Sequence, residues 1–299
     1  MASGSNPRVV VITRQTEVEG LLELHATMGQ ARFFLEQRKR SPQPAIARQE
    51  AQQSTLQQIE SAIPTSWRRV RIQRQDVDRF LFEPDDIVVA VGQDGLVANV
   101  AKYLQGNPVI GINPDPTRNP GILVPHRPAR FPELLDLTIQ RQAKIEERTM
   151  VEARLQDGQT LVAVNEVFIG HHSHQSARYE LRWAEQTEKQ SSSGVIVTTG
   201  TGATGWAKSI HQERHSTLDL PQPTAQRLCF FVREAWPSIA TGTSLTEGTL
   251  EAHQRLEIVS GMENGGVIFG DGIENDYLEF TWGERALIGV AQQRLYLVV

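Results

Sequence analysis

The sequence predicts two domains, an α/β domain built on a parallel sheet and then a β-rich domain. Buried strand-like runs alternate with helical patterns over residues 1–125, whereas short alternating segments separated by turn residues fill residues 126–285. The chain has 299 residues, which is long enough for two domains of ordinary size. We expect the last strand, over residues 286–299, to return to the first domain.

The first domain opens with a β-branched run over residues 8–13, which is typical of a buried parallel strand, and continues with a helical pattern over residues 17–24. Residues 31–50 are basic and contain two prolines, so we expect an exposed excursion there and not a helix. A helix over residues 52–62 and a strand over residues 69–72 follow.

A second buried strand, over residues 86–91, leads into the turn Gly92-Gln-Asp-Gly-Leu96. A helix over residues 97–104 and a strand over residues 109–112 come next. This order implies parallel strands joined by right-handed crossovers. Ligands of open α/β sheets bind outside the carboxyl ends of the strands, so the turn lies at a ligand-facing edge. In the second domain we expect strands over residues 161–169, 179–183, 194–199 and 255–259.

Composition excludes several classes of protein. The chain carries 30 Lys and Arg against 35 Asp and Glu, a net charge of -5, which disfavours a nucleic-acid partner. No apolar run approaches the ~18 residues of a membrane helix, so we expect no membrane partner. The N-terminus has neither a signal-peptide core nor a basic presequence, and the single Cys229 is expected to be a buried hydrophobe. We therefore expect a cytoplasmic protein.

The Gly92–Leu96 turn has the features of a phosphate-binding turn. Its glycines permit close backbone approach, and the start of a helix favours anions. A carboxylate beside a phosphate is repulsive unless it accepts a proton or organises a metal, which gives Asp94 a possible catalytic role. The alternative is that Asp94 merely caps the following helix.

Two further segments carry polar groups suited to a nucleotide. Asn165 and Glu166 interrupt an apolar strand, and their amide and carboxylate suit a nucleobase edge or a ribose diol; the alternative is a strand-end pair satisfied by backbone. Small and hydroxyl residues fill a Thr/Gly segment over residues 192–206, which lets a ligand lie on the backbone. Its Trp206 supplies either a flat face for the ligand or the start of a helix.

Together, in this order, the three segments resemble the NAD kinase family over residues 8–215, and particularly its mitochondrial-type branch. Gly92-Gln-Asp-Gly95 resembles the family's Gly-Gly-Asp-Gly-Thr, Asn165-Glu166 its Asn-Glu/Asp pair, and Thr199-Gly-Thr-Gly202 its dinucleotide loop. The branch is indicated by residues 109–118 and by Gly200, which stands where most members have proline.

This resemblance implies a domain of the NAD kinase/diacylglycerol kinase-like type, a β-rich domain, and a dinucleotide in the cleft between them. The activity would be transfer of the terminal phosphoryl group of ATP, or of polyphosphate, to the adenosine-ribose 2′-hydroxyl of NAD, giving NADP. Magnesium would be held chiefly by the ATP phosphates. The family's habit also implies a homodimer.

Site residues carry over by position. The resemblance implies that Asp94 is the catalytic residue, that Gly92, Gln93, Gly95 and Asn113 bind the phosphates of ATP, and that NAD is bound by Asn165, Glu166, Thr199, Thr201, Gly202, Thr204 and Trp206.

Two positions of the turn depart from the family pattern: Gln93 replaces the second glycine, and Leu96 replaces a threonine. We expect both side chains to lie where phosphates bind, and a left-handed backbone at residue 93 would cost ~1–2 kcal/mol. Either Gln93 donates its amide to a phosphate in an active kinase, which we favour, or the protein only binds NAD or NADP as a sensor. A kinase of a lipid or sugar is a third alternative, which the Asn165-Glu166 pair disfavours.

Two other motifs have simpler interpretations. His171, His172 and His174 are expected in an exposed hairpin loop and not at a metal. Asp271 lies in Gly270-Asp-Gly272, which resembles a late turn of the family but is also a common hairpin turn signal.

Overall fold

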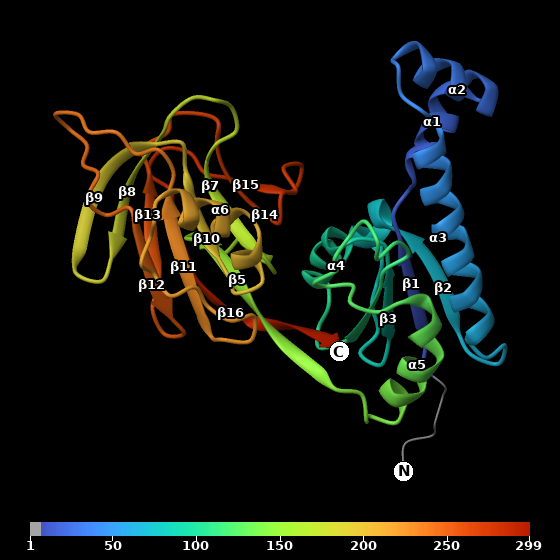
Figure 1. The fold of residues 1–299 in the computed structure, drawn as a ribbon. Helices are drawn as coiled ribbons and strands as arrows, with labels where there is room; N and C mark the ends of the chain where they lie inside the picture. Colours follow the sequence, from blue (N-terminus) through green and yellow to red (C-terminus); the bar gives the residue numbers. More distant parts are fainter. Residues whose placement is uncertain (1–6) are drawn as a thin grey trace. The chain divides into compact units, whose positions relative to one another are not determined.

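The computed structural model describes residues 7–299, which form two compact units (Figure 1). Unit 1 extends to Glu146 and includes Tyr296–Val299, and unit 2 comprises Glu147–Leu295. The division lies beyond residue 125 because helix α5 (Phe131–Ile139) buries Phe131 and Leu135 in the core of unit 1. Within residues 7–299, the helices are all too short or too polar to cross a bilayer.

A parallel sheet forms the centre of unit 1, as predicted. Its strands follow the order β2-β1-β3-β4, and the end of β16 pairs in parallel with β4. The strands are β1 (Val9–Thr13), β2 (Arg69–Gln73), β3 (Ile87–Val91), β4 (Pro108–Ile112) and β16 (Arg285–Val298).

Four of these strands end at the same level. Thr13 pairs with both Gln73 and Val91, and Val91 pairs with Ile112. The residues that follow, Arg14, Arg74, Gly92 and Asn113, therefore leave the sheet side by side, and we call this set the carboxyl edge. Strand β2 lies on one side of β1, and β3, the next strand along the chain, lies on the other side of β1. The direction of the strand order therefore reverses between β1 and β3.

Helices cover both faces of this sheet, because the crossovers that start from β1 and from β3 run in opposite directions. Leu56 and Ile59 of α3 share a core cluster with α5 and with Val89 of the sheet, while α4 follows β3 and contacts β3 and β4. The helices are α1 (Glu17–His25), α2 (Met28–Gln37), α3 (Gln43–Ala62), α4 (Asp94–Ala101) and α5, with the short 3-10 helices η1 (Arg74–Arg79) and η2 (Pro128–Arg130).

The expectation of an exposed excursion over residues 31–50 is wrong, because this stretch forms most of α2 and the first part of α3. The Thr27 hydroxyl accepts the Gln30 N–H at 3.2 Å and so caps α2. Pro44 lies in the first turn of α3, where a missing N–H costs nothing. Helix α4 also begins at Asp94, earlier than the predicted residue 97.

Unit 2 is a β-sandwich, which confirms the β-rich second half. One sheet has the order β12-β11-β10-β7-β14-β15; in the other, β16, β13, β8 and β9 are neighbours, and β5 pairs with β6. The main core lies between the sheets and includes Ile169 of β7 and Ile258 of β13. The strands are β5 (Ile145–Leu155), β6 (Thr160–Ala163), β7 (Glu166–His171), β8 (Ala177–Trp183), β9 (Gln186–Ser192), β10 (Val195–Thr198), β11 (Arg227–Val232), β12 (Glu247–Glu251), β13 (Leu256–Ser260), β14 (Gly266–Gly270) and β15 (Tyr277–Glu279).

The outer face of the six-stranded sheet is covered by α6 (Trp206–Glu213), which follows the 3-10 helix η3 (Gly202–Thr204). Ala207 and Ile210 of α6 pack there on Phe231 and on Cys229, which is buried as predicted. The predicted strand over residues 161–169 is interrupted. Val164 and Asn165 belong to neither β6 nor β7, and we call them the β6–β7 corner.

Candidate functional site

Asp94 begins α4, and its carboxylate binds a neighbouring loop. Oδ1 accepts the backbone N–H groups of Leu123 (2.7 Å) and Val124 (3.1 Å), and Oδ2 accepts that of Ile122 (3.0 Å). The alternative that Asp94 merely caps its own helix is wrong: the residue at the cap position is Gln93, and its side chain makes no capping bond. Asp94 thus holds residues 122–124 beside the carboxyl edge.

Asn113 and Gln93 are tied to the same loop through Asn119. The Asn113 amide donates to the Asn119 carbonyl at 2.8 Å, and its oxygen accepts the Asp115 N–H at 3.0 Å. The Gln93 Nε2 group donates to the Asn119 side-chain oxygen at 3.3 Å. Gly121 has a φ of +74°, and a Cβ there would lie 2.5 Å from the Val124 carbonyl oxygen, so the loop requires glycine.

Leu96 does not lie where phosphates were expected. Its side chain is 3% exposed and is buried beneath the turn, with Cδ2 3.3 Å from the position that a Cβ would take at Gly92. The backbone of Gln93 has a φ of -105°, which any residue adopts without strain. The expected penalty of a left-handed conformation at residue 93 is therefore wrong, although the exposed Gln93 side chain does lie at the turn.

In unit 2, Asp271 holds the β6–β7 corner. Its carboxylate accepts the N–H groups of Val164 (3.0 Å) and Asn165 (2.7 Å), and its own N–H donates to the Glu166 carbonyl at 3.0 Å. Asp271 and Gly272 both have positive φ, 54° and 69°, as the Asp-Gly pair suggests. The sequence indicated the turn but not this anchoring of a corner more than 100 residues earlier.

The corner packs directly on the turn formed by Thr199–Thr204, which we call the threonine turn. The Thr199 N–H donates to the Asn165 carbonyl at 2.8 Å, and the Thr199 hydroxyl donates to the Val164 carbonyl at 2.5 Å. A Cβ at Gly202 would lie 2.2 Å from the Asn165 carbonyl oxygen, so only glycine fits. The structure thus brings two of the predicted segments into contact.

The three predicted threonines differ in what their hydroxyl groups can offer a ligand. The Thr199 hydroxyl also accepts the N–H groups of Thr201 (3.1 Å) and Gly202 (3.3 Å) and so organises the turn. The Thr204 hydroxyl donates to the Thr201 carbonyl at 2.9 Å. The Thr201 hydroxyl is buried and makes no hydrogen bond within residues 7–299, so it is an unsatisfied polar group inside the turn.

Glu166 is the first residue of β7 and lies opposite Thr198 of β10. Burial, and then the negative charge of Asp271, raise the pKa of Glu166 from 4.5 to about 7. At neutral pH this carboxyl group is therefore present in both protonation states, so it is able to donate a hydrogen bond as well as to accept one.

Trp206 starts α6, which is one of the two roles predicted for it. Its ring is 38% exposed and stacks on Phe168 with centroids 6.1 Å apart, and the Arg233 guanidinium lies 4.9 Å from the Trp206 centroid. His171, by contrast, is not exposed as expected: it is buried, and its Nδ1 accepts the Ser173 N–H at 3.1 Å.

No family model matches the chain. Among curated proteins, the chain is 35% identical over 133 residues to an NAD kinase of Methylococcus capsulatus and 25% identical over 224 residues to a probable NADH kinase of Oryza sativa subsp. japonica. The first match covers 42% of this chain and 44% of the relative, so the chain spans less than half of that relative's length; the second covers 67% of each.

Two solved structures match almost the whole chain, each with a TM-score of 0.60. An NAD kinase from Archaeoglobus fulgidus in complex with ATP is 16% identical and matches 98% of this chain and 93% of its own. Yeast NADH kinase complexed with NADH is 17% identical and matches 98% of this chain and 84% of its own. The chain has the fold of the NAD kinases. The predicted fold class is thereby confirmed.

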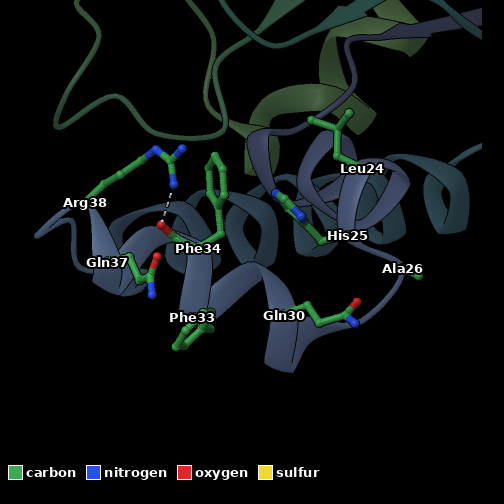
Figure 2. A pocket seen from close by; sticks show the side chains of 8 residues that line it. All are labelled: Leu24, His25, Ala26, Gln30, Phe33, Phe34, Gln37 and Arg38. Carbon is green, nitrogen blue, oxygen red and sulfur yellow. Dashed lines mark hydrogen bonds between the residues drawn. The ribbon is translucent and has the colours of Figure 1, made fainter.

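On this NAD kinase fold, one cavity lies apart from the predicted site residues. It has a volume of about 480 Å³ and is formed by α1 and α2 (Figure 2). The Phe34 ring is tilted by 41° against that of His25, with centroids 4.4 Å apart, and the Arg38 guanidinium lies 3.7 Å from the Phe34 centroid. None of the residues that line this cavity was predicted to bind a nucleotide.

Proposed function

We propose that the protein is an NAD kinase that transfers the terminal phosphoryl group of ATP, or of polyphosphate, to the adenosine-ribose 2′-hydroxyl of NAD. The sequence similarity to NAD and NADH kinases and the shared fold support this proposal. The observation that carries it is the packing of the Asn165-Glu166 pair on the threonine turn, because these predicted NAD-binding segments form one hydrogen-bonded group. The match to the rice NADH kinase supports the mitochondrial-type branch.

In this proposal Asp94 orients the acceptor hydroxyl and takes its proton at Oδ2. A carboxylate oxygen has two lone pairs; Oδ1 accepts two backbone N–H groups, whereas Oδ2 accepts one. Oδ2 therefore keeps one lone pair for the substrate. Loop 122–124 fixes the orientation of the carboxylate, and fixed positioning supplies much of the rate enhancement in phosphoryl transfer.

The groups of unit 2 hold the adenosine part of NAD. The half-protonated Glu166 carboxyl suits a ribose diol, which needs both an acceptor and a donor. Thr201 and Gly202 belong to the same turn, where the absence of a side chain at Gly202 lets the Asn165 carbonyl lie against the backbone of the turn. Asn165 adds an amide beside them.

Magnesium enters this proposal with ATP. We propose that the ion keeps several waters and is held mainly by the substrate phosphates, as is usual for Mg²⁺. When bound, it would neutralise charge on the transferred phosphoryl group.

A sensor that binds NAD or NADP without turnover is the alternative, because the Gln93 side chain lies at the phosphate turn. One assay separates the two functions: purified protein is incubated with NAD, Mg²⁺ and either ATP or polyphosphate, and NADP is measured, while calorimetry measures binding of NAD and NADP. We expect NADP to form with wild type. Binding without NADP formation would select the sensor.

Replacing Asp94 by Asn tests its role. General-base assistance contributes ~10²–10⁴-fold, so we expect turnover to fall by that order. Affinity for NAD should change much less, since the carbonyl oxygen of Asn keeps the contacts to Leu123 and Val124. Equal losses in turnover and NAD affinity would contradict the role of base.

From the resemblance to the NAD kinase family we propose that the protein is a homodimer. Light scattering during size-exclusion chromatography measures the mass in solution, and a monomeric mass at micromolar concentration would exclude the dimer.

A further inference from the structure

Two arginines leave the carboxyl edge beside the Gly92 turn. Arg14 follows β1 and Arg74 follows β2, at the level at which Gly92 follows β3. Neighbouring strands are ~5 Å apart, so the backbone of Arg14 is about one strand spacing from Gly92 and that of Arg74 about two. An arginine side chain spans about one strand spacing, so Arg14 is the nearer of the two to the turn.

The guanidinium of Arg74 lies against α4, the helix that begins with Asp94. With the Asn99 amide oxygen turned toward it, this oxygen accepts from both Nε (2.6 Å) and Nη2 (3.0 Å) of Arg74. A neutral amide satisfies hydrogen bonds but does not neutralise a charge. Burial, and then the positive charge of Arg14, lower the pKa of Arg74, so the two guanidinium groups repel each other.

Neither arginine has a carboxylate partner within residues 7–299, although other arginines of the same sheet do. Arg8 pairs with Asp86 at 2.6 Å, and Arg71 pairs with Glu60 at 3.3 Å. The backbone of Arg14 is held in place, because Gln52 of α3 donates to its carbonyl at 2.8 Å. Arg14 is exposed and Arg74 is partly buried, so the two adjacent guanidinium groups, which have no carboxylate partner among the described residues, present positive charge to an anion at this edge.

The position of the pair fits the general location of ligand sites in such sheets. Arg14 and the Gly92–Asp94 turn flank the point between β1 and β3 at which the strand order reverses, and ligands bind outside the carboxyl ends of strands at such points. Guanidinium groups bind phosphate oxygens through paired hydrogen bonds in a planar geometry.

We propose that Arg14 and Arg74 bind the phosphate chain of the phosphoryl donor beside the Gly92–Asp94 turn. This inference rests on the proposed kinase function and adds to it the residues that hold the donor. Arg14 is the stronger test of the two, because Arg74 also makes a structural contact with Asn99, whereas no side-chain hydrogen bond or ion pair of Arg14 occurs within residues 7–299.

The experiment measures KM for ATP and for NAD in Arg14→Gln, Arg74→Gln and the double variant. Charge-assisted hydrogen bonds contribute enough that we expect KM for ATP to rise about tenfold in each single variant and more in the double variant. KM for NAD should stay within about twofold. Arg79→Gln, which removes an exposed positive charge at the far end of η1, is the matched control and should leave both values unchanged.

Arg14→Lys tests whether the positive charge itself contributes to ATP binding. Because lysine keeps the charge, we expect this variant to bind ATP more tightly than Arg14→Gln does. Thermal unfolding of each variant separates a loss of donor binding from a loss of folding. If wild type makes NADP and the folded double variant keeps the wild-type KM for ATP, the arginine site is overturned while the kinase function stands.

If wild type makes no NADP, calorimetry with MgATP and with tripolyphosphate still decides. Binding that disappears in Arg14→Gln supports the anion site and rejects only the kinase function. Wild type that binds neither compound overturns the site.

Discussion

Glu166 ionises near neutral pH because the fold buries its carboxyl group beside Asp271. A folded-state pKa of about 7, above the ordinary 4.5, means that the folded protein holds this proton more tightly than the unfolded chain does. The resulting stability is present at low pH and is lost as the pH rises from about 4.5 through about 7. Over that interval the loss approaches ~3 kcal/mol.

The Glu166→Gln variant removes this titration. We expect the difference in the free energy of unfolding, variant minus wild type, to increase by ~3 kcal/mol from pH 5 to pH 8. Urea denaturation at several pH values measures it. Glu279→Gln, which removes an exposed carboxylate of β15, is the control for the loss of a charge. A difference between Glu166→Gln and wild type that does not change with pH would show that Glu166 ionises normally.

At the scale of elements, the β6–β7 corner depends on an acceptor supplied by the turn after β14. In Asp271→Asn, one oxygen remains to accept a backbone N–H, while the new NH₂ group opposes the second donor. A buried donor left unsatisfied costs ~1–3 kcal/mol, so we expect unfolding at lower denaturant together with weaker NAD binding.

Calorimetry with NAD tests whether Asp271 positions the NAD-binding residues. It compares Asp271→Asn with the control Asp157→Asn, which replaces an acid in the exposed turn between β5 and β6. If both variants bind NAD as wild type does, the corner does not position the NAD-binding residues.

The sequence predicts the elements whose pattern is local. The apolar runs of β1, β3 and β4 fix the parallel sheet, and their order places Asp94 at its carboxyl edge. Helix α2 and the start of α3 were missed because their surfaces are largely polar and charged, so that only a few residues such as Ala31 and Leu35 are buried. The composition of residues 31–50 is therefore typical of an exposed segment, although these residues form helices.

The parts of the site that the sequence does not predict depend on distant contacts. Asp271 lies far along the chain from the corner it holds, and Arg14 is separated from Arg74 by the whole of α1, α2 and α3. Each is an ordinary residue in its own segment, and only the strand register and the folded turns give it a neighbour. The burial of Leu96 was likewise unpredictable from the motif, because residue 96 faces the core from the first turn of α4.

For the whole molecule, we propose that unit 1 binds the phosphates of the donor and that unit 2 binds the adenosine part of NAD. The donor phosphates contact groups of unit 1, Arg14, Arg74 and the Gly92–Asp94 turn, whereas the adenosine part of NAD contacts the corner and the threonine turn of unit 2. Hydrogen exchange measured by mass spectrometry on the full chain distinguishes the two binding sites, because a ligand slows exchange in the segments that it orders.

With NADP alone, we expect protection over residues 164–171 and 198–206, and with MgATP alone, protection over residues 92–96 and 119–124. The second segment responds because the Asp94 carboxylate holds residues 122–124, so that ordering the turn also orders the loop. In Arg14→Gln the MgATP response should require about tenfold more ligand, while the NADP response stays at the wild-type concentration. Protection of the threonine turn by MgATP alone would contradict this assignment, because it would place the donor on the unit that the proposals reserve for NAD.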